Sequence, residues 1–229
     1  MGKCDLYIGK QFDFFKSMTP NEKEEFRQNS TPFKVKKGDI IFFKNEHLKK
    51  LFFIFEGACK FSIIDTNGKE HITKLLGEGE LMGRRSVITN KGALVTATAI
   101  ANTTLYSFDK KAILRCMNKN NAFCQDILKG FIEDIDDEVE KIIYFQNYRP
   151  LKIRLAGLLL YLSKKFGVET NGWISVSLRR QDIANILGTV TESCIRNLSV
   201  LKKEGLISCL GKKMRILDNN KLENFIFDV

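Results

Sequence analysis

The sequence is poor in the residues that mark fibrous, metal-binding and membrane proteins. It has 3 Pro and 16 Gly in 229 residues, too few for a fibrous chain. Its 2 His and 6 Cys are scattered, with no CxxC, so they form neither a zinc nor an iron–sulfur ligand pattern. No run approaches the roughly 18 consecutive apolar residues of a membrane span. Residues 1–10 lack the apolar segment of a secretory signal, so we expect a cytoplasmic protein with reduced thiols, no metal and no membrane partner.

The familiar motifs of catalysis are missing as well. The chain has no GxSxG, no GxxxxGK[ST] and no HExxH, so we expect a protein that is not an enzyme and holds no cofactor. Its hydrophobic fraction of 44% nevertheless excludes a wholly disordered chain. The length allows one large domain or two small ones.

The chain does have an excess of positive charge, a formal +10, and this excess is unevenly distributed. Residues 147–229 hold 14 Lys+Arg against 7 Asp+Glu, whereas residues 1–146 hold 23 against 20. A basic segment favours polyanionic partners, chiefly nucleic acid. We therefore look for a nucleic-acid interface in the last third of the chain.

The first half of the chain reads as short strands joined by turns. The predicted strands lie at 33–41, 51–64 (two strands around Gly57), 69–76, 95–101 and 103–108. Asn67-Gly68 predicts a two-residue hairpin turn, because such turns need positive φ. Since no helical pattern separates these strands, we expect an antiparallel sandwich or roll.

A long amphipathic helix is predicted over residues 126–145. Its apolar residues recur at spacings of three and four and approximate a heptad seam: Leu128, Phe131, Ile132, Ile135, Val139 and Ile142. The seam is compatible with a dimerisation helix or with a helix packed on the β domain. Pro150 disfavours helix at the residue before it, so we place the domain boundaries at 1–125, 126–146 and 147–229.

Residues 178–201 have the layout of a helix-turn-helix. Gly188 lies where a tight turn needs positive φ, and Thr191 can cap the second helix. The inner face of that helix would be formed by Cys194, Ile195, Leu198 and Leu201. Glu192, Ser193 and Arg196 fall in its first turns and project outward, where a recognition helix reads base edges in the major groove.

Basic residues surround this helix pair. Leu206–Leu217 reads as a two-stranded wing that turns at Gly211. The residues that we expect to contact DNA phosphates are Arg179, Arg180, Thr191, Lys202, Lys203, Lys212 and Lys213. An ordinary corner between two helices is the alternative, but four basic clusters around one helix pair favour a winged helix.

These segments together resemble the Crp/Fnr superfamily of bacterial transcription regulators. RQDIANILG, ESCIRNL and LKKEGLIS are similar to its DNA-binding signature, and GELMG and FEGACKFSIIDTNGKE are similar to parts of its cyclic-nucleotide-binding β-roll. The resemblance implies an α+β fold: an N-terminal antiparallel β-roll, a long dimerisation helix and a C-terminal winged helix-turn-helix. It also implies a homodimer that binds a pseudo-palindromic site on double-stranded DNA and works with RNA polymerase.

The resemblance places an effector pocket at Gly79, Glu80, Gly83, Arg84 and Arg85. Members that bind cyclic AMP carry a glutamate at the position of Arg84 and an Arg-Ser pair near residues 91–95, where this chain has no arginine. We therefore expect no cyclic-AMP binding of the usual kind, and the effector stays unknown. Arg84 and Arg85 could bind another anion or pair with acidic residues such as Asp134 or Asp137.

Two alternatives to an effector-controlled DNA-binding regulator stay open. One is a small-molecule sensor whose winged helix docks a protein. The other is a dimeric DNA-binding protein with a vestigial pocket.

Overall fold

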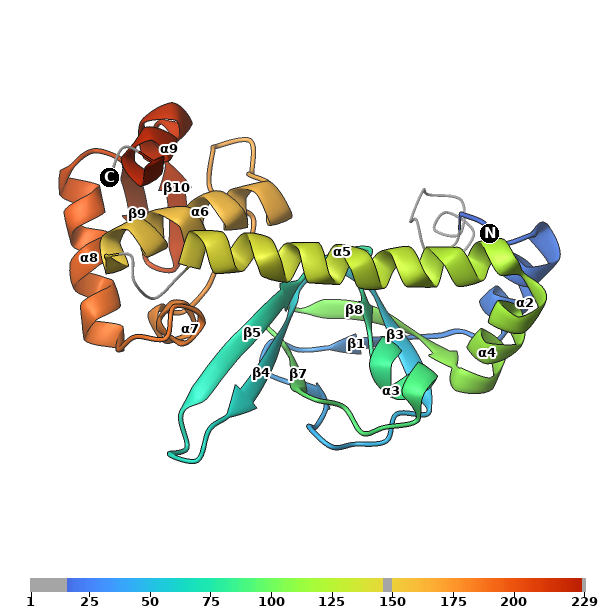
Figure 1. Ribbon diagram of the computed structural model, residues 1–229. Coiled ribbons are helices and arrows are strands. Elements are labelled where there is room, and N and C mark those ends of the chain that lie inside the picture. Colours follow the sequence, from blue (N-terminus) through green and yellow to red (C-terminus); the bar gives the residue numbers. More distant parts are fainter. Residues whose placement is uncertain (1–15, 146–149, 228–229) are drawn as a thin grey trace. The chain divides into compact units, whose positions relative to one another are not determined.

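The computed structural model describes residues 16–145 and 150–227, which form two compact units. Figure 1 shows the helices and strands and colours them by their position in the sequence. They are α2 (Pro20–Gln28), β1 (Thr31–Val35), β2 (Ile40–Phe42), β3 (Lys50–Glu56), β4 (Cys59–Ile64), β5 (Glu70–Leu76), β6 (Leu81–Met82), α3 (Arg84–Thr89), β7 (Thr96–Ala99), β8 (Thr103–Asp109), α4 (Lys110–Lys119), α5 (Asn121–Phe145), α6 (Leu151–Phe166), α7 (Arg180–Ile186), α8 (Thr191–Lys203), β9 (Ile207–Leu210), β10 (Lys213–Ile216) and α9 (Asn219–Phe227).

The N-terminal part is the antiparallel β-roll that the sequence predicts. Its strands form two four-stranded sheets, in the orders β1-β8-β3-β6 and β2-β7-β4-β5. Gly57, between β3 and β4, has φ 101, and a Cβ there would lie 2.6 Å from Thr103 Oγ1, so the strand connection requires glycine. The predicted α+β fold class is confirmed.

Strand β3 separates two hydrophobic cores, because its side chains alternate between the faces of the sheet. Leu51 and Phe53 belong to a core with Phe26, Ile113 and Phe123 of the helices α2, α4 and α5. Ile54 belongs to a second core inside the roll, which it forms with Phe42, Leu48, Cys59, Leu76, Met82, Ala93, Ala97 and Leu105. In Figure 1, α5 runs along the roll, with α2 and α4 beside its first turns.

Four short elements of the roll were not predicted from the sequence: α2, β6, α3 and α4. The hairpin turn also differs from the prediction. Asp65 N donates to Lys69 O, and of the residues between them only Gly68 has positive φ, so the loop has three residues rather than two. The Asp65 carboxylate accepts from the amides of Asn67 and Lys69 and stabilises this longer loop.

The long helix α5 begins at Asn121, five residues earlier than predicted. Only Asn120 separates it from α4. Four of the predicted seam residues form a stripe that is exposed by 54, 58, 62 and 50%: Leu128, Ile132, Ile135 and Val139. Phe131 is a correction to the seam, since its side chain packs against the core of the β-roll. The side chain of Ile142 lies outside the described residues.

The C-terminal part is a winged helix. The apolar helix α6 packs against α8 and α9, and buries Leu155, Leu158, Leu159 and Leu162. Strands β9 and β10 pair as the predicted wing, with Gly211 at its turn in the left-handed conformation. Among the described helices, none is long and apolar enough to cross a membrane.

Candidate nucleic-acid interface

Helices α7 and α8 form the predicted helix-turn-helix. Helix α7 ends at its C-cap Leu187, and Gly188 follows with φ 62, in the left-handed region that the sequence predicts. The turn is closed by a hydrogen bond of 3.0 Å from Thr189 N to Ala184 O. Because glycine adopts this conformation without steric cost, it sets the direction in which α8 leaves the turn.

Helix α8 has one buried and one exposed face. Cys194, Leu198 and Leu201 are buried, whereas Glu192 and Arg196 are exposed and Ser193 is half-buried. Ile195, predicted on the inner face, is 47% exposed, because one residue beyond Cys194 turns its side chain by about 100° around the helix. The exposed face therefore combines a carboxylate, a hydroxyl and a guanidinium in the first turns of α8.

Two hydrogen bonds organise this exposed face. Arg196 Nη2 donates to Ser193 Oγ over 3.1 Å, and Asn197 Nδ2 donates to Ser193 O over 2.9 Å. Asn197 is half-buried, and the donor Nδ2 of its amide is bonded within its own helix. The helix can thus hold a polar residue at this position without leaving it unpaired.

Thr191 has a different role from the predicted cap. The N-cap of α8 is Val190, which makes no side-chain capping bond, and the Thr191 hydroxyl donates to Gln181 Oε1 over 2.6 Å. Gln181 Nε2 in turn donates to Asn185 Oδ1 over 2.8 Å. This chain of hydrogen bonds joins the start of α8 to exposed Gln181 and buried Asn185 of α7. Gln181 was missed, because no local pattern marks it.

Arg154 is a second residue that the sequence analysis missed. It lies on α6, is 9% exposed, and donates from Nη1 to the carbonyl oxygen of Leu187 over 2.7 Å. Burial lowers the pKa of the Arg154 guanidinium. The hydrogen bond from Arg154 to Leu187 O connects the corner of the helix-turn-helix to α6. One signal was available: Arg154 is a charged residue inside the apolar stretch LKIRLAGLLLYL.

Apart from Thr191, the residues predicted to contact phosphates divide into two groups of three. Three make polar contacts within the winged helix. Arg179 donates from Nε and Nη2 to the two carboxylate oxygens of Asp182. Arg180 Nη2 donates to Gly211 O over 2.9 Å, and Lys213 pairs with Glu169 at 3.1 Å. Hydrogen bonding to Asp182 raises the pKa of Arg179.

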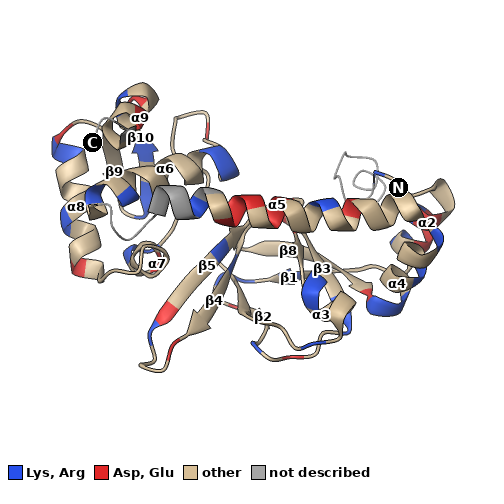
Figure 2. Cartoon of the chain, viewed as in Figure 1, with Lys and Arg blue, Asp and Glu red and all other residues tan. Residues whose placement is uncertain are grey.

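The second group comprises Lys202, Lys203 and Lys212, which are exposed at the end of α8 and at the wing turn. Figure 2 shows basic residues at the C-terminal end of α8 and along β10. Both places adjoin the helix-turn-helix in the fold of this unit, since β9 follows α8 directly and Arg180 touches the wing turn. The winged helix therefore presents positive charge around a polar recognition-type face.

The segment that resembles an effector pocket is built from two left-handed glycines. Gly79 has φ 87 and Gly83, the N-cap of α3, has φ 93. Arg84 Nη2 donates to Asp134 Oδ2 on α5, so the predicted pairing with Asp134 is observed. Arg85 instead donates to the carbonyl oxygen of Gly92 over 2.7 Å. Glu80 accepts from Gly77 N over 2.7 Å.

Three cysteines of the described chain are deeply buried. Burial raises the pKa of the Cys59 and Cys116 thiols to about 12 and that of Cys194 to about 11. Such thiols stay protonated and behave as small apolar groups. Within residues 16–145 and 150–227, no three His, Cys, Asp or Glu side chains come together as a metal site.

Comparison with known proteins agrees with this architecture. Residues 32–120 match the cyclic nucleotide-binding domain family, and residues 153–225 match the Crp-like helix-turn-helix domain family. The chain is 26% identical over 201 residues to the global nitrogen regulator of Nostoc sp., covering 86% of both chains. It is 21% identical over 213 residues to the CRP-like cAMP-activated global transcriptional regulator of Mycobacterium tuberculosis, covering 91% of this chain and 93% of the relative.

A solved structure has the same fold. FixK2 from Bradyrhizobium japonicum matches with a TM-score of 0.76 at 17% identity, over 85% of this chain and 96% of that one. The two family matches occur in the same order as the β-roll and the winged helix, on either side of α5. The chain belongs to the Crp/Fnr superfamily of transcription regulators.

Proposed function

We propose that this protein is a homodimeric, sequence-specific DNA-binding regulator that works without cyclic AMP. One observation carries the DNA-binding part: the first turns of α8 expose Glu192 and Arg196 while Cys194 and Leu198 anchor the opposite face in the core. A helix held in this way can enter the major groove with its N-terminal side chains toward the bases.

The residue types suit direct reading of bases. The Arg196 guanidinium can donate two hydrogen bonds to O6 and N7 of guanine, and the Glu192 carboxylate can accept from the amino group of cytosine. Lys202, Lys203 and Lys212 are exposed and suit phosphate contacts, which fix the position of the protein on the duplex. Arg179, Arg180 and Lys213 would have to exchange or extend their present contacts to reach DNA.

The homodimer is supported by the exposed stripe on α5. Leu128, Ile132, Ile135 and Val139 are spaced by four, three and four residues, which is the seam of a two-stranded coiled coil. Half-exposed Leu, Ile and Val in water are unfavourable, and a second copy of the same helix would cover them. Such a dimer would present two α8 helices about 34–36 Å apart, one turn of DNA.

The oligomeric state is tested by light scattering coupled to size-exclusion chromatography. The chain has a mass of 26.3 kDa, and we expect a particle of about twice that mass at micromolar concentration. A particle of 26.3 kDa under these conditions would contradict the dimer.

Independence from cyclic AMP is supported by the charges of the β-roll. The Arg84 guanidinium is already bound to Asp134, and the segment 91–95 has no arginine to receive a cyclic phosphate. A phosphate buried without a cationic partner carries a desolvation cost of several kcal/mol. The relative from Mycobacterium tuberculosis is named as cAMP-activated, so it is the positive control. Isothermal titration should give no heat of binding, and micromolar affinity would overturn this part.

DNA binding is tested by selecting a site from a randomised DNA library and measuring its affinity by fluorescence anisotropy. The expected site is pseudo-palindromic, and the logarithm of the affinity should fall linearly with the logarithm of the salt concentration. Affinity without salt dependence would instead favour a winged helix that docks a protein. We include RNA polymerase as a partner, a cytoplasmic location and the absence of enzymatic activity in the proposal, because the relatives are transcription regulators.

A further inference from the structure

The β-roll contains a cluster in which two basic side chains share one carboxylate. Lys74 Nζ of β5 donates to Asp134 Oδ1, and Arg84 Nη2 of α3 donates to Asp134 Oδ2. The side chains of Lys74 and Arg84 are only 9% and 13% exposed, and Asp134 is 34% exposed. Glu80 lies near the cluster, 3.9 Å from Lys74 Nζ. Two cations directed at the two oxygens of one carboxylate are the arrangement of a carboxylate-binding site.

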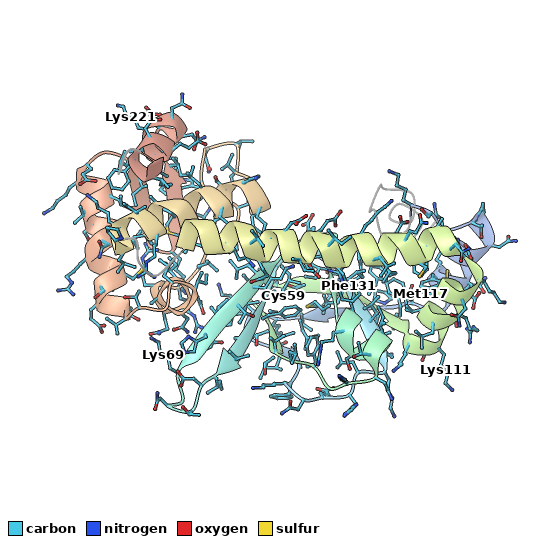
Figure 3. The ribbon with its side chains drawn as sticks, viewed as in Figure 1. Cys59, Lys69, Lys111, Met117, Phe131 and Lys221 are labelled. Carbon is cyan, nitrogen blue, oxygen red and sulfur yellow. The ribbon has the colours of Figure 1, made fainter. Side chains whose placement is uncertain are left out.

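Helix α5 is shaped to receive this cluster. A Cβ at Gly130, one turn before Asp134, would overlap Arg84 Nη1, so the guanidinium lies in space that only glycine leaves open. The Arg84 guanidinium also stacks on Phe131, with Cζ 5.3 Å from the ring centroid. Figure 3 shows Phe131 on the side of α5 that faces the sheets. Glycine inside a helix lowers its stability, and the close approach of Arg84 explains why one is present.

The basic side chains of the cluster already have carboxylate partners within the chain. Lys74 and Arg84 both bind Asp134, and Lys74 also lies 3.9 Å from Glu80, so a free anion would have to compete with these carboxylates. Figure 2 shows basic residues at the start of α3 and acidic residues in the middle of α5. If the Asp134 carboxylate were removed, two nearly buried cations would lose their shared partner, which is costly.

We propose that this cluster is a carboxylate-binding site that the protein fills with its own Asp134. Asp134 connects β5 and α3 of the roll to α5 without a ligand. A small free carboxylate should bind between Lys74 and Arg84 once the Asp134 carboxylate is deleted. The inference deepens the proposed function, on which its DNA-binding consequence rests, but the binding of the carboxylate can be measured without DNA.

The test uses the full chain with Asp134→Ala and, in parallel, Asp134→Ser, in case one replacement alone impairs folding. Thermal unfolding is recorded in 0.1 M potassium acetate and in 0.1 M potassium chloride. With a dissociation constant of about 10 mM, acetate should raise the melting temperature of both variants by about 3–5 °C relative to chloride. Wild type should show no acetate-specific shift. The matched control Asp136→Ala, which removes an exposed carboxylate of the same helix, should behave as wild type.

Two further variants locate the effect. Adding Arg84→Met to Asp134→Ala should abolish the acetate shift, because one of the two cations is gone. Gly130→Ala should displace Arg84 from its place on α5 and lower the melting temperature of the otherwise wild-type chain. Equal melting temperatures in acetate and chloride for both Asp134 variants would overturn the proposal, as would an acetate shift in wild type.

DNA affinity separates this inference from the proposed function. If wild type binds no DNA site, the proposed function is wrong. The acetate-dependent change in melting temperature of the Asp134 variants still tests whether the cluster binds a carboxylate. If wild type binds DNA, Asp134→Ala should bind it at least threefold more weakly in chloride and regain affinity in acetate, measured at equal cation concentration.

Discussion

Three basic side chains of the winged helix and two of the β-roll are used in opposite ways. In the winged helix, Arg196 is exposed in the first half of α8, Lys202 at its C-terminal end and Lys212 at the wing turn. In the β-roll, Lys74 and Arg84 are almost buried and share the Asp134 carboxylate. A count of positive charges therefore does not identify an anion-binding surface. Exposure and existing partners separate these five side chains: Arg196, Lys202 and Lys212 are exposed to an anionic partner, whereas Lys74 and Arg84 are paired within the chain.

The largest effect is expected from Ile132→Glu on the exposed stripe of α5. Two like charges facing each other across the helix pair would prevent dimerisation, so that each protomer binds only a half-site. We expect a monomer in light scattering and a loss of DNA affinity of about 100-fold or more, on the order of 3 kcal/mol. Glu133→Gln, on the same exposed turn, is the control and should remain dimeric. A dimeric Ile132→Glu protein would exclude the stripe as the interface.

Arg154→Met comes next, because it removes a buried charge that serves structure rather than DNA contact. The carbonyl oxygen of Leu187 would lose its donor, which lowers the free energy of unfolding by about 1–3 kcal/mol. Chemical denaturation measures this loss. Lys164→Met, at an exposed position of the same helix, should change stability by less than about 0.5 kcal/mol. An unchanged denaturation midpoint for Arg154→Met would show that the corner is held by packing alone.

Arg196→Ala tests whether the exposed face of α8 reads bases. Binding to the selected site should weaken by about 1–3 kcal/mol, and the preference at one base pair of each half-site should relax. A competition assay with single-base variants of the site measures this preference. Stability should change little, because Arg196 is exposed. If the base preferences of the variant match those of wild type, α8 lies on the DNA in another register.

The smallest effect is expected from Lys212→Ala and Lys213→Ala at the wing. Lys212 is exposed, so its loss should weaken all DNA sequences alike and reduce the salt slope by about 1 per protomer. Lys213 pairs with Glu169, so its removal should change the slope less. Anisotropy titrations at several salt concentrations give both slopes. A change in sequence preference for Lys212→Ala would mean that the wing reads bases.

Local patterns predicted much of the fold, because each rests on the conformation of a few residues. Gly188 and Gly211 mark turns that require positive φ, and both turns occur as expected. The faces of helices were less predictable. Phe131 and Ile195 are apolar residues at the border of a stripe, and only tertiary packing decides that one faces the core and the other faces water.

Contacts between distant residues could not be predicted from local patterns. The partner of Arg84 is 50 residues away on another element, and the sequence left Asp134 as one of several possibilities. The overlooked signal is Gly130, since a glycine within an amphipathic helix marks a close approach of another group. Arg154 had a comparable signal, a charge within the apolar part of α6, and here too the position of its partner Leu187 depends on the tertiary fold.

The contrast between the two regions is tested most directly by one titration of wild-type protein against its selected DNA site. Anisotropy is measured with and without cyclic AMP over a range of salt concentrations. We predict the same dissociation constant with and without the nucleotide, and an affinity that falls steeply as salt rises. Binding that requires cyclic AMP would contradict the internally filled β-roll, and affinity independent of salt would contradict DNA contact by the basic winged helix.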